Sequence, residues 1–176
     1  MMTMPTQLKS AQILDDCQRS LDLLEDVPEG DKQLFRIYWT FCLVSLRRVV
    51  DAMEKYDIGA FPEMRGAYEQ RKKELKDLKD RYHKDTPFKD CPLDYLIYYR
   101  LIHGERNIAV HEAVQTYSVP WSFHGPDGLF DLGDIYLPMG NLDLWGDWDC
   151  RDWLKEAICW WWREIKVYTK DCSAQA

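Results

Sequence analysis

One short polar stretch of this sequence carries an arginine and a histidine five residues apart, with an asparagine directly after the arginine. These residues are Arg106, Asn107 and His111. Histidine titrates near neutral pH and can act as a general acid or base, and the planar donors of arginine match a phosphate group. Asparagine can orient an imidazole or hydrogen-bond a sugar. These residue types together indicate phosphodiester chemistry, and RNA cleavage through the 2′-hydroxyl needs little more.

The stretch forms the second half of a predicted helix that opens near residues 90–92. A proline there is typical of a helix start, because its missing N–H would have no partner in the first turn. At about 100° per residue, Arg106 and His111 lie about 140° apart around the helix. They can therefore meet at one substrate only in a cleft, and a symmetric helical dimer would supply one.

The same helix is predicted to bury one apolar arc. At helical spacing this arc holds Leu93, Ile97, Leu101, Gly104 and Ile108. Gly104 costs roughly 1 kcal/mol against alanine, which close approach of another helix would offset. His103 lies on a second arc with Arg106 and Asn107, and we predict that it lines the cleft. Arg100 is also predicted to contact the substrate.

The spacing from Arg106 to His111 fits the Arg-x(4–6)-His motif of HEPN domains, in which a polar residue after the arginine is common. The chain resembles this family in motif and helix order over roughly residues 6–170. The resemblance implies a helical bundle and a metal-independent endoribonuclease, as found in toxin–antitoxin and other defence systems. Such proteins work as homodimers with both motifs at the interface.

Within that resemblance, we expect His111 to be the general acid or base, Arg106 the phosphate clamp and Asn107 the orienting residue. The products would carry 2′,3′-cyclic phosphate and 5′-hydroxyl ends. The expected partners are RNA, a second copy of the chain and an antitoxin or other protein regulator. No cofactor is predicted, and no metal site either, because asparagine is a poor ligand in the His103, Asn107 and His111 series.

Composition bounds the class of protein. The 176 residues predict one domain, residues 1–176, and their 46% hydrophobic and 30% charged content is typical of globular chains. A net charge of −7 argues against a general nucleic-acid coating protein but permits a nuclease with a local positive cleft. The six cysteines have no paired spacing, so we expect reduced core residues. Without a signal peptide or a membrane span, a cytoplasmic location is predicted.

Hydrophobic spacing predicts an all-α bundle of four to five helices. Besides the motif helix, these run from Leu8 to Leu24, from Leu34 to Tyr56 with Asp31 as cap, over residues 63–84, and over residues 149–170. Residues 116–141 are rich in glycine and proline, and alternation over 119–123 and 129–132 predicts a short β-hairpin or an ordered loop before the last helix.

Two basic clusters precede the motif. Arg47 and Arg48 in the second helix are either solvated or placed for phosphate contact beside the motif helix. The third helix carries a narrow heptad stripe for a two-helix seam, with basic residues 71–73 beside it. Those residues form either a solvated face or the basic edge of an RNA groove.

Two other functions stay open at this point. A HEPN-like scaffold would bind RNA or a nucleotide without turnover. A helical protein-interaction module would use the tryptophans at residues 160–162 and the charged third helix to bind a partner. The nuclease predicts cleavage that depends on Arg106 and His111, the scaffold predicts binding alone, and the interaction module predicts neither.

Overall fold

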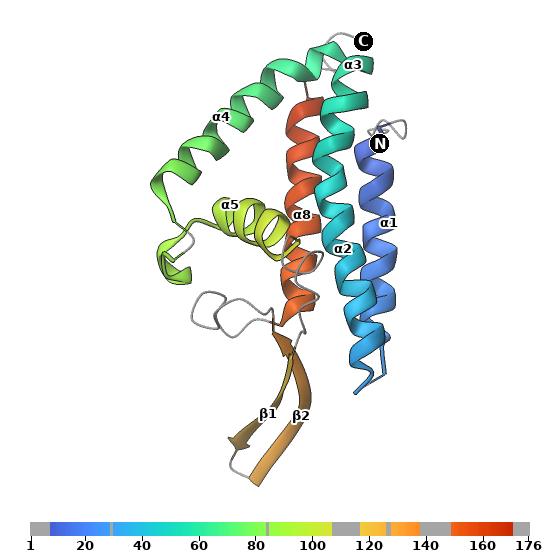
Figure 1. The fold of residues 1–176 in the computed structure, drawn as a ribbon, viewed down its shortest axis with the longest axis vertical. Helices are drawn as coiled ribbons and strands as arrows, with labels where there is room; N and C mark the ends of the chain where they lie inside the picture. The colour runs from blue at the N-terminus through green and yellow to red at the C-terminus, as the bar shows by residue number, and fades with distance from the viewer. Residues whose placement is uncertain are drawn as a thin grey trace.

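The structure, a computed structural model, describes residues 8–28, 30–83, 85–106 and 149–170, and the backbone of residues 117–125 and 128–137. Within these ranges, three long helices lie side by side (Figure 1). They are α1 (Lys9–Glu25), α2 (Lys32–Ala52) and α8 (Cys150–Thr169). The predicted all-α bundle is confirmed, and each of these helices matches a predicted one to within a few residues, the second together with its helical continuation over residues 53–57.

The remaining helical elements complete the bundle on one side. After α2 the chain continues as η1 (Met53–Asp57), α3 (Ile58–Ala60) and η2 (Pro62–Met64). The helix α4 (Arg65–Arg81) then leans away from α2, and η3 (Phe88–Asp90) leads to α5 (Leu93–Tyr95) and η4 (Leu96–Glu105). The segment α5–η4 lies between α4 and the three long helices (Figure 1). This arrangement brings α2, α4 and η4 around one space.

One apolar core joins the helices. Leu14 of α1, Leu46 of α2, Leu101 of η4 and Trp153 of α8 are all fully buried in it. Burial of this kind is the main favourable term in folding. Within the described part of the chain, none of the helices is long and apolar enough to cross a membrane.

Aspartate side chains accept hydrogen bonds from the first backbone N–H groups of α2 and α1. Asp31 caps α2 as predicted, and its carboxylate accepts from Leu34 N at 3.0 Å. The start of α1 has no cap of its own, and Asp57 of η1 supplies one from a distance. Its two oxygens accept from Lys9 N at 2.8 Å and from Ser10 N at 3.0 Å. The start of α1 is thereby held against the end of α2.

The motif helix is wound as a π-helix from Leu96 to Glu105. Its hydrogen bonds join residues five apart, and each turn takes more residues than an α-helical turn, so side chains four or five residues apart share one face. The buried residues follow this repeat: Tyr95, Arg100 and Glu105 in one row, Leu96 and Leu101 in the next, and Ile97 and Ile102 in a third. π-Helices are usually single turns, so a run of ten residues is unusual.

The predicted apolar arc was wrong in part, because it assumed the α-helical repeat. Ile97 and Leu101 are buried as expected, but Leu93 is 39% exposed and Gly104 is only partly buried. Ile108 lies outside the described residues. The π-helical repeat of η4 turns Gly104 away from the centre of the buried face.

The heptad stripe of α4 forms the predicted seam. Met64, Tyr68 and Leu75 are buried, and α4 packs against α5 and α8. The polar side of α4 is left facing α2. That side carries the lysines described below.

Residues 117–137 contribute two antiparallel strands, β1 (Tyr117–Gly125) and β2 (Gly128–Leu137). Tyr117 pairs with Leu137 and Gly125 with Gly128, with a register shift between Pro120 and Ser122. The alternating segments 119–123 and 129–132 lie within these strands. The two strands project away from the helices, beyond the N-terminal end of α8 (Figure 1).

Candidate functional site

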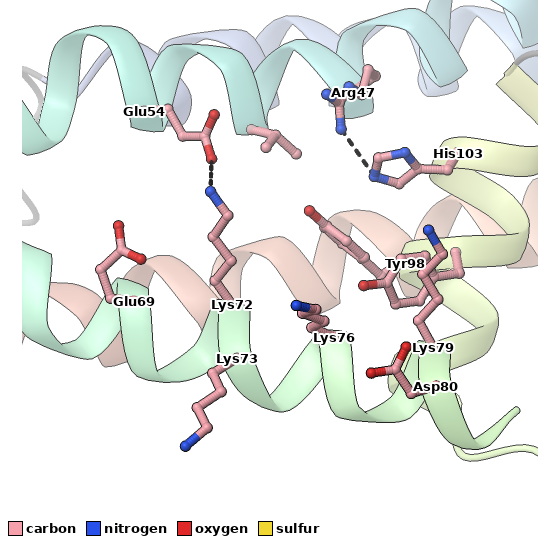
Figure 2. Close-up of a pocket in the computed structure, with 12 residues that line it drawn as sticks. Arg47, Glu54, Glu69, Lys72, Lys73, Lys76, Lys79, Asp80, Tyr98 and His103 are labelled. Atoms are coloured by element: carbon pink, nitrogen blue, oxygen red, sulfur yellow. Dashed lines mark hydrogen bonds and ion pairs between the residues drawn. The ribbon is translucent and has the colours of Figure 1, made fainter.

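A groove of about 710 Å³ lies between α2, α4 and η4 (Figure 2). Arg47 of α2 lines one wall, four lysines of α4 line the facing wall, and η4 supplies aromatic side chains at one end. Five of the lining residues are basic and three are acidic, although the whole chain has a net charge of −7. The groove is therefore a local positive site on an acidic protein, and it would attract an anionic ligand.

The lysines follow one face of α4. Lys72, Lys76 and Lys79 are four and then three residues apart, so their side chains lie above one another on the helix. Lys72 reaches towards η1, where its Nζ lies 2.8 Å from Glu54 Oε1. The hydrogen bond from Lys72 is the main cause that lowers the pKa of Glu54. Lys76 and Lys79 continue the row towards His103 (Figure 2).

Arg47 and His103 meet at the η4 end of the groove. The distance between Arg47 Nη1 and His103 Nε2 is 2.9 Å. A guanidinium can only donate, so Nε2 is the acceptor and the ring proton is assigned to Nδ1. Burial, followed by the charges of Arg47, Lys79 and Arg106, lowers the pKa of His103 to about 4. His103 is therefore uncharged at neutral pH.

Aromatic rings surround this imidazole. The ring of Tyr98 lies 4.8 Å from that of His103, and the ring of Tyr99 lies 5.9 Å from it, between centroids. Tyr98 and His103 are five residues apart, which the π-helix places in one row. The Lys79 ammonium lies 5.8 Å from the centre of the Tyr99 ring. Cations beside ring faces are what proteins use to hold the phosphates and bases of single-stranded nucleic acid.

The predicted catalytic set is described only at its first residue. Arg106 follows η4 directly and is partly buried. Its charge contributes to the low pKa of His103, so it lies within electrostatic reach of the groove end. Asn107 and His111 lie outside the described residues. The mutual geometry of these three residues therefore stays a prediction.

Arg100, predicted to contact substrate, lies on the buried side of η4 and is 7% exposed. Its Nη2 donates to the carbonyl of His83 at 3.1 Å and to that of Thr86. These bonds hold the loop that joins α4 to η3. The repeat of five places Arg100 in the same buried row as Tyr95 and Glu105, away from the groove.

Only one of the two arginines predicted on α2 reaches the groove. Arg47 lines it, whereas Arg48 is exposed and is not among the lining residues. Consecutive residues of an α-helix point about 100° apart, and of this pair only Arg47 is turned towards the groove. Arg48 is therefore a natural control for Arg47.

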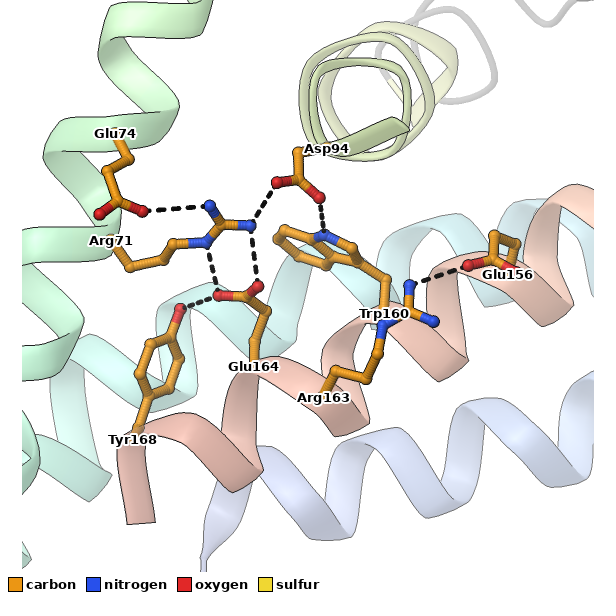
Figure 3. A network of polar contacts seen from close by, with 8 residues as sticks. All are labelled: Arg71, Glu74, Asp94, Glu156, Trp160, Arg163, Glu164 and Tyr168. Atoms are coloured by element: carbon orange, nitrogen blue, oxygen red, sulfur yellow. Dashed lines mark hydrogen bonds and ion pairs between the residues drawn. The ribbon is translucent and has the colours of Figure 1, made fainter. Parts of the chain in front are cut away.

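The basic cluster at residues 71–73 is divided by the fold. Lys72 and Lys73 line the groove, whereas Arg71 points to α8 and α5 (Figure 3). Arg71 makes a two-pronged pair with Glu164, with both N–O distances at 2.9 Å, and a third contact of 2.6 Å with Asp94. Burial alone would lower the pKa of Arg71, but its bonds to Glu164 and Asp94 outweigh this and raise it. Arg71 thus has a structural role.

Gly104 does not serve the close helix contact expected of it. A Cβ added there would meet only the carbonyl oxygen of Tyr99, in the same helix, at 3.4 Å. No atom of another helix lies within 4 Å of that position among the described residues.

Sequence reasoning singled out Arg47, His103 and the cluster at residues 71–73 but missed Lys76, Lys79 and Tyr98 as groove residues. The lysine spacing was visible, yet rows of lysine are common on solvated helix faces. In the part of the chain that the structure describes, no group of three or more His, Cys, Asp or Glu side chains could hold a metal ion. Comparison of the chain with protein-family models, curated proteins and solved structures finds no match.

Proposed function

We propose that the protein is a metal-independent endoribonuclease of the HEPN type, and that the groove between α2, α4 and η4 binds the RNA backbone. The observation that carries this proposal is the row of cations along the groove, which ends close to Arg106. Phosphate contacts supply much of the affinity of proteins for nucleic acid. An acidic protein needs such a local positive surface to hold RNA.

The proposed reaction is an attack by the ribose 2′-oxygen on the adjacent phosphorus. His111 acts as the general acid or base, taking the 2′-hydroxyl proton or giving one to the departing 5′-oxygen. Arg106 stabilises the charge that builds up on the phosphate, and Asn107 orients the imidazole. The bond from phosphorus to the 5′-oxygen breaks, which leaves a 2′,3′-cyclic phosphate and a 5′-hydroxyl.

Two protomers contribute to each site in this proposal. On an α-helix Arg106 and His111 would point about 140° apart, so a second copy of the chain supplies the missing side chain at each phosphate. The resemblance to HEPN proteins supports a toxin or defence role in the cytoplasm, with an antitoxin or another protein as regulator.

The first test is cleavage of a labelled, structured RNA by the purified full chain in excess EDTA. The variants are Arg106→Ala and His111→Ala, with His83→Ala as a control because His83 is exposed and does not line the groove. We expect the wild type and the control to leave cyclic phosphate ends, and the two site variants to lose at least about 100-fold in rate. Equal cleavage by all four proteins would contradict the proposal.

A mixing experiment tests the shared site. The Arg106→Ala and His111→Ala proteins are combined and allowed to exchange subunits. A mixed dimer retains one site with both an intact arginine and an intact histidine, so about a quarter of the wild-type activity should return. If activity stays absent although light scattering shows mixed dimers, each site belongs to one protomer.

A binding scaffold without catalysis is the second candidate. The observation in its favour is that the groove itself holds cations for a phosphate and aromatic rings for a base, so binding would not require His111. It predicts that wild type and His111→Ala bind RNA equally and that neither cleaves it. The interaction module has less support, because Trp160 and Trp161 are buried and only Trp162 of the three tryptophans is partly exposed.

A further inference from the structure

We propose that Arg47 and His103 form a phosphate-binding subsite for the RNA backbone at the η4 end of the groove, in which His103 Nε2 accepts from the Arg47 guanidinium and positions it. The inference rests on the proposed binding of RNA in this groove. It adds two specific roles there, a binding residue on α2 and a positioning residue on η4, both outside the Arg106–His111 motif.

Arg47 keeps donors available for a ligand. Of its five N–H groups, Nη1 donates to His103, Nη2 lies 3.4 Å from Asp51 Oδ1, and the guanidinium also hydrogen-bonds the Tyr98 side chain. The Asp51 side chain is 59% exposed, and such surface pairs are weak and easily exchanged. The Arg47 side chain itself is 31% exposed and faces the groove (Figure 2). A phosphate can therefore approach the planar fork of donors that suits it.

The neutral state of His103 explains why this partner suits a phosphate site. A carboxylate in its place would orient the guanidinium equally well but would cancel its charge. An uncharged imidazole holds Arg47 and leaves the positive charge available for a ligand. The rings of Tyr98 and Tyr99 pack against the imidazole and fix its plane, so the acceptor atom has a defined direction.

The facing wall completes the subsite. Lys79 extends over the ring of Tyr99, and its charge acts on His103, as does that of Arg106. A phosphate at this end of the groove would therefore meet Arg47 from α2 and Lys79 from α4. The ring of Tyr99 would lie beside it for the attached base.

The test is binding of a fluorescent 2′-O-methyl RNA, which has no free 2′-hydroxyl and is not cleaved. Anisotropy titrations at several salt concentrations compare the full-length wild type with Arg47→Ala, Arg48→Ala, His103→Ala and His103→Gln. We expect Arg47→Ala to weaken binding about tenfold and to reduce the salt slope by about one phosphate contact. Arg48→Ala, the matched arginine outside the groove, should keep both the affinity and the slope.

The two histidine variants separate positioning from packing. The glutamine side chain has a carbonyl oxygen that can accept from Arg47, so His103→Gln should bind nearly as well as the wild type. His103→Ala should bind as weakly as Arg47→Ala. Thermal unfolding of each variant shows whether it is folded at the titration temperature.

Several outcomes would overturn the subsite. The first is that the wild type does not bind the RNA, and the second is that Arg47→Ala and Arg48→Ala have equal affinity and salt slope. The third is that His103→Ala and His103→Gln weaken RNA binding equally. Cleavage of unmodified RNA, measured in parallel, separates this inference from the nuclease proposal. Binding that depends on Arg47, without cleavage, would support the subsite and contradict the nuclease proposal. Cleavage with a KM that is unchanged in Arg47→Ala would support the nuclease and contradict the subsite.

Discussion

His103 lies among three positive charges, those of Arg47, Lys79 and Arg106, and the carboxylate of Asp51 opposes them. Burial and each cation disfavour a protonated imidazole, which is why its pKa falls to about 4. The residue is thus poorly suited to exchange protons at neutral pH. In the proposed enzyme that task belongs to His111, and His103 serves the binding of the phosphate.

Because of this low pKa, the free energy of unfolding should fall as the pH falls. Because the folded pKa of about 4 lies below the ordinary 6.5, the folded state binds fewer protons than the unfolded state between these values. The contribution of neutral His103 is fully present above about pH 6.5 and is lost as pH falls through 4. Urea unfolding from about pH 7 to 4 should show a smaller loss of stability for His103→Gln than for the wild type. Parallel losses would contradict this assignment.

Asp57 offers a second residue-scale prediction. It is 2% exposed and accepts two backbone N–H groups at the start of α1, so Asp57→Ala leaves two donors without a partner. We expect a loss of about 2–3 kcal/mol in the free energy of unfolding. The control Asp31→Ala removes an exposed cap of α2 and should cost about 1 kcal/mol. Denaturant titrations that give equal losses would contradict the proposed role of Asp57.

At the scale of the elements, Arg71 and its partners hold α4 against the bundle. Glu164 of α8 accepts from Arg71 and also from the Tyr168 hydroxyl at 2.7 Å, while Asp94 accepts from Trp160 Nε1 at 2.9 Å (Figure 3). Every charge in this network has a partner, so burial of the network is tolerated. The wall of the groove formed by α4 depends on it.

Arg71→Met should therefore destabilise the protein strongly, because it leaves the nearly buried carboxylate of Glu164 without its cation. We expect a loss of about 3 kcal/mol in the free energy of unfolding, measured in urea. Lys72→Met, one residue away, breaks an exposed pair with Glu54 and should cost less than about 1 kcal/mol. Adding Glu164→Leu to Arg71→Met should recover part of the loss, and failure to do so would argue against an uncompensated charge as its cause.

For the whole molecule, the contrast between net charge and groove charge decides which ligands can bind. The Debye length is about 8 Å at physiological ionic strength, so a ligand in the groove responds mainly to the lysines and Arg47. The overall negative charge acts at longer range and slows the approach of RNA at low salt.

A charge reversal compares these two effects. Lys76→Glu with Lys79→Glu changes the net charge by the same amount as Lys32→Glu with Lys166→Glu, but only the first pair lines the groove. The groove pair should weaken the 2′-O-methyl RNA complex at least tenfold, and the distant pair less than about threefold at physiological salt. Equal effects would mean that RNA binds through the general field of the protein and not in the groove.

Much of the fold could be predicted from apolar spacing. The limits of α1, the Asp31 cap of α2, the seam of α4 and the start of α8 all follow from residues close together in the chain. The motif helix was less well predicted, because its winding changes the residues that share a face. No residue pattern along the chain marks this π-helical repeat in advance, and the structure places Arg100, predicted to contact substrate, on the buried side of η4.

The sequence alone therefore determines the limits of most helices and the presence of the Arg106–His111 motif, since these depend on residues near one another in the chain, and its composition sets the acidic net charge. The groove was decided only by tertiary structure. Arg47, Lys79 and His103 come from three different elements, and the packing of α4 through Arg71 sets the space between them. Their shared electrostatics, including the neutral state of His103, exist only once burial and distance are established.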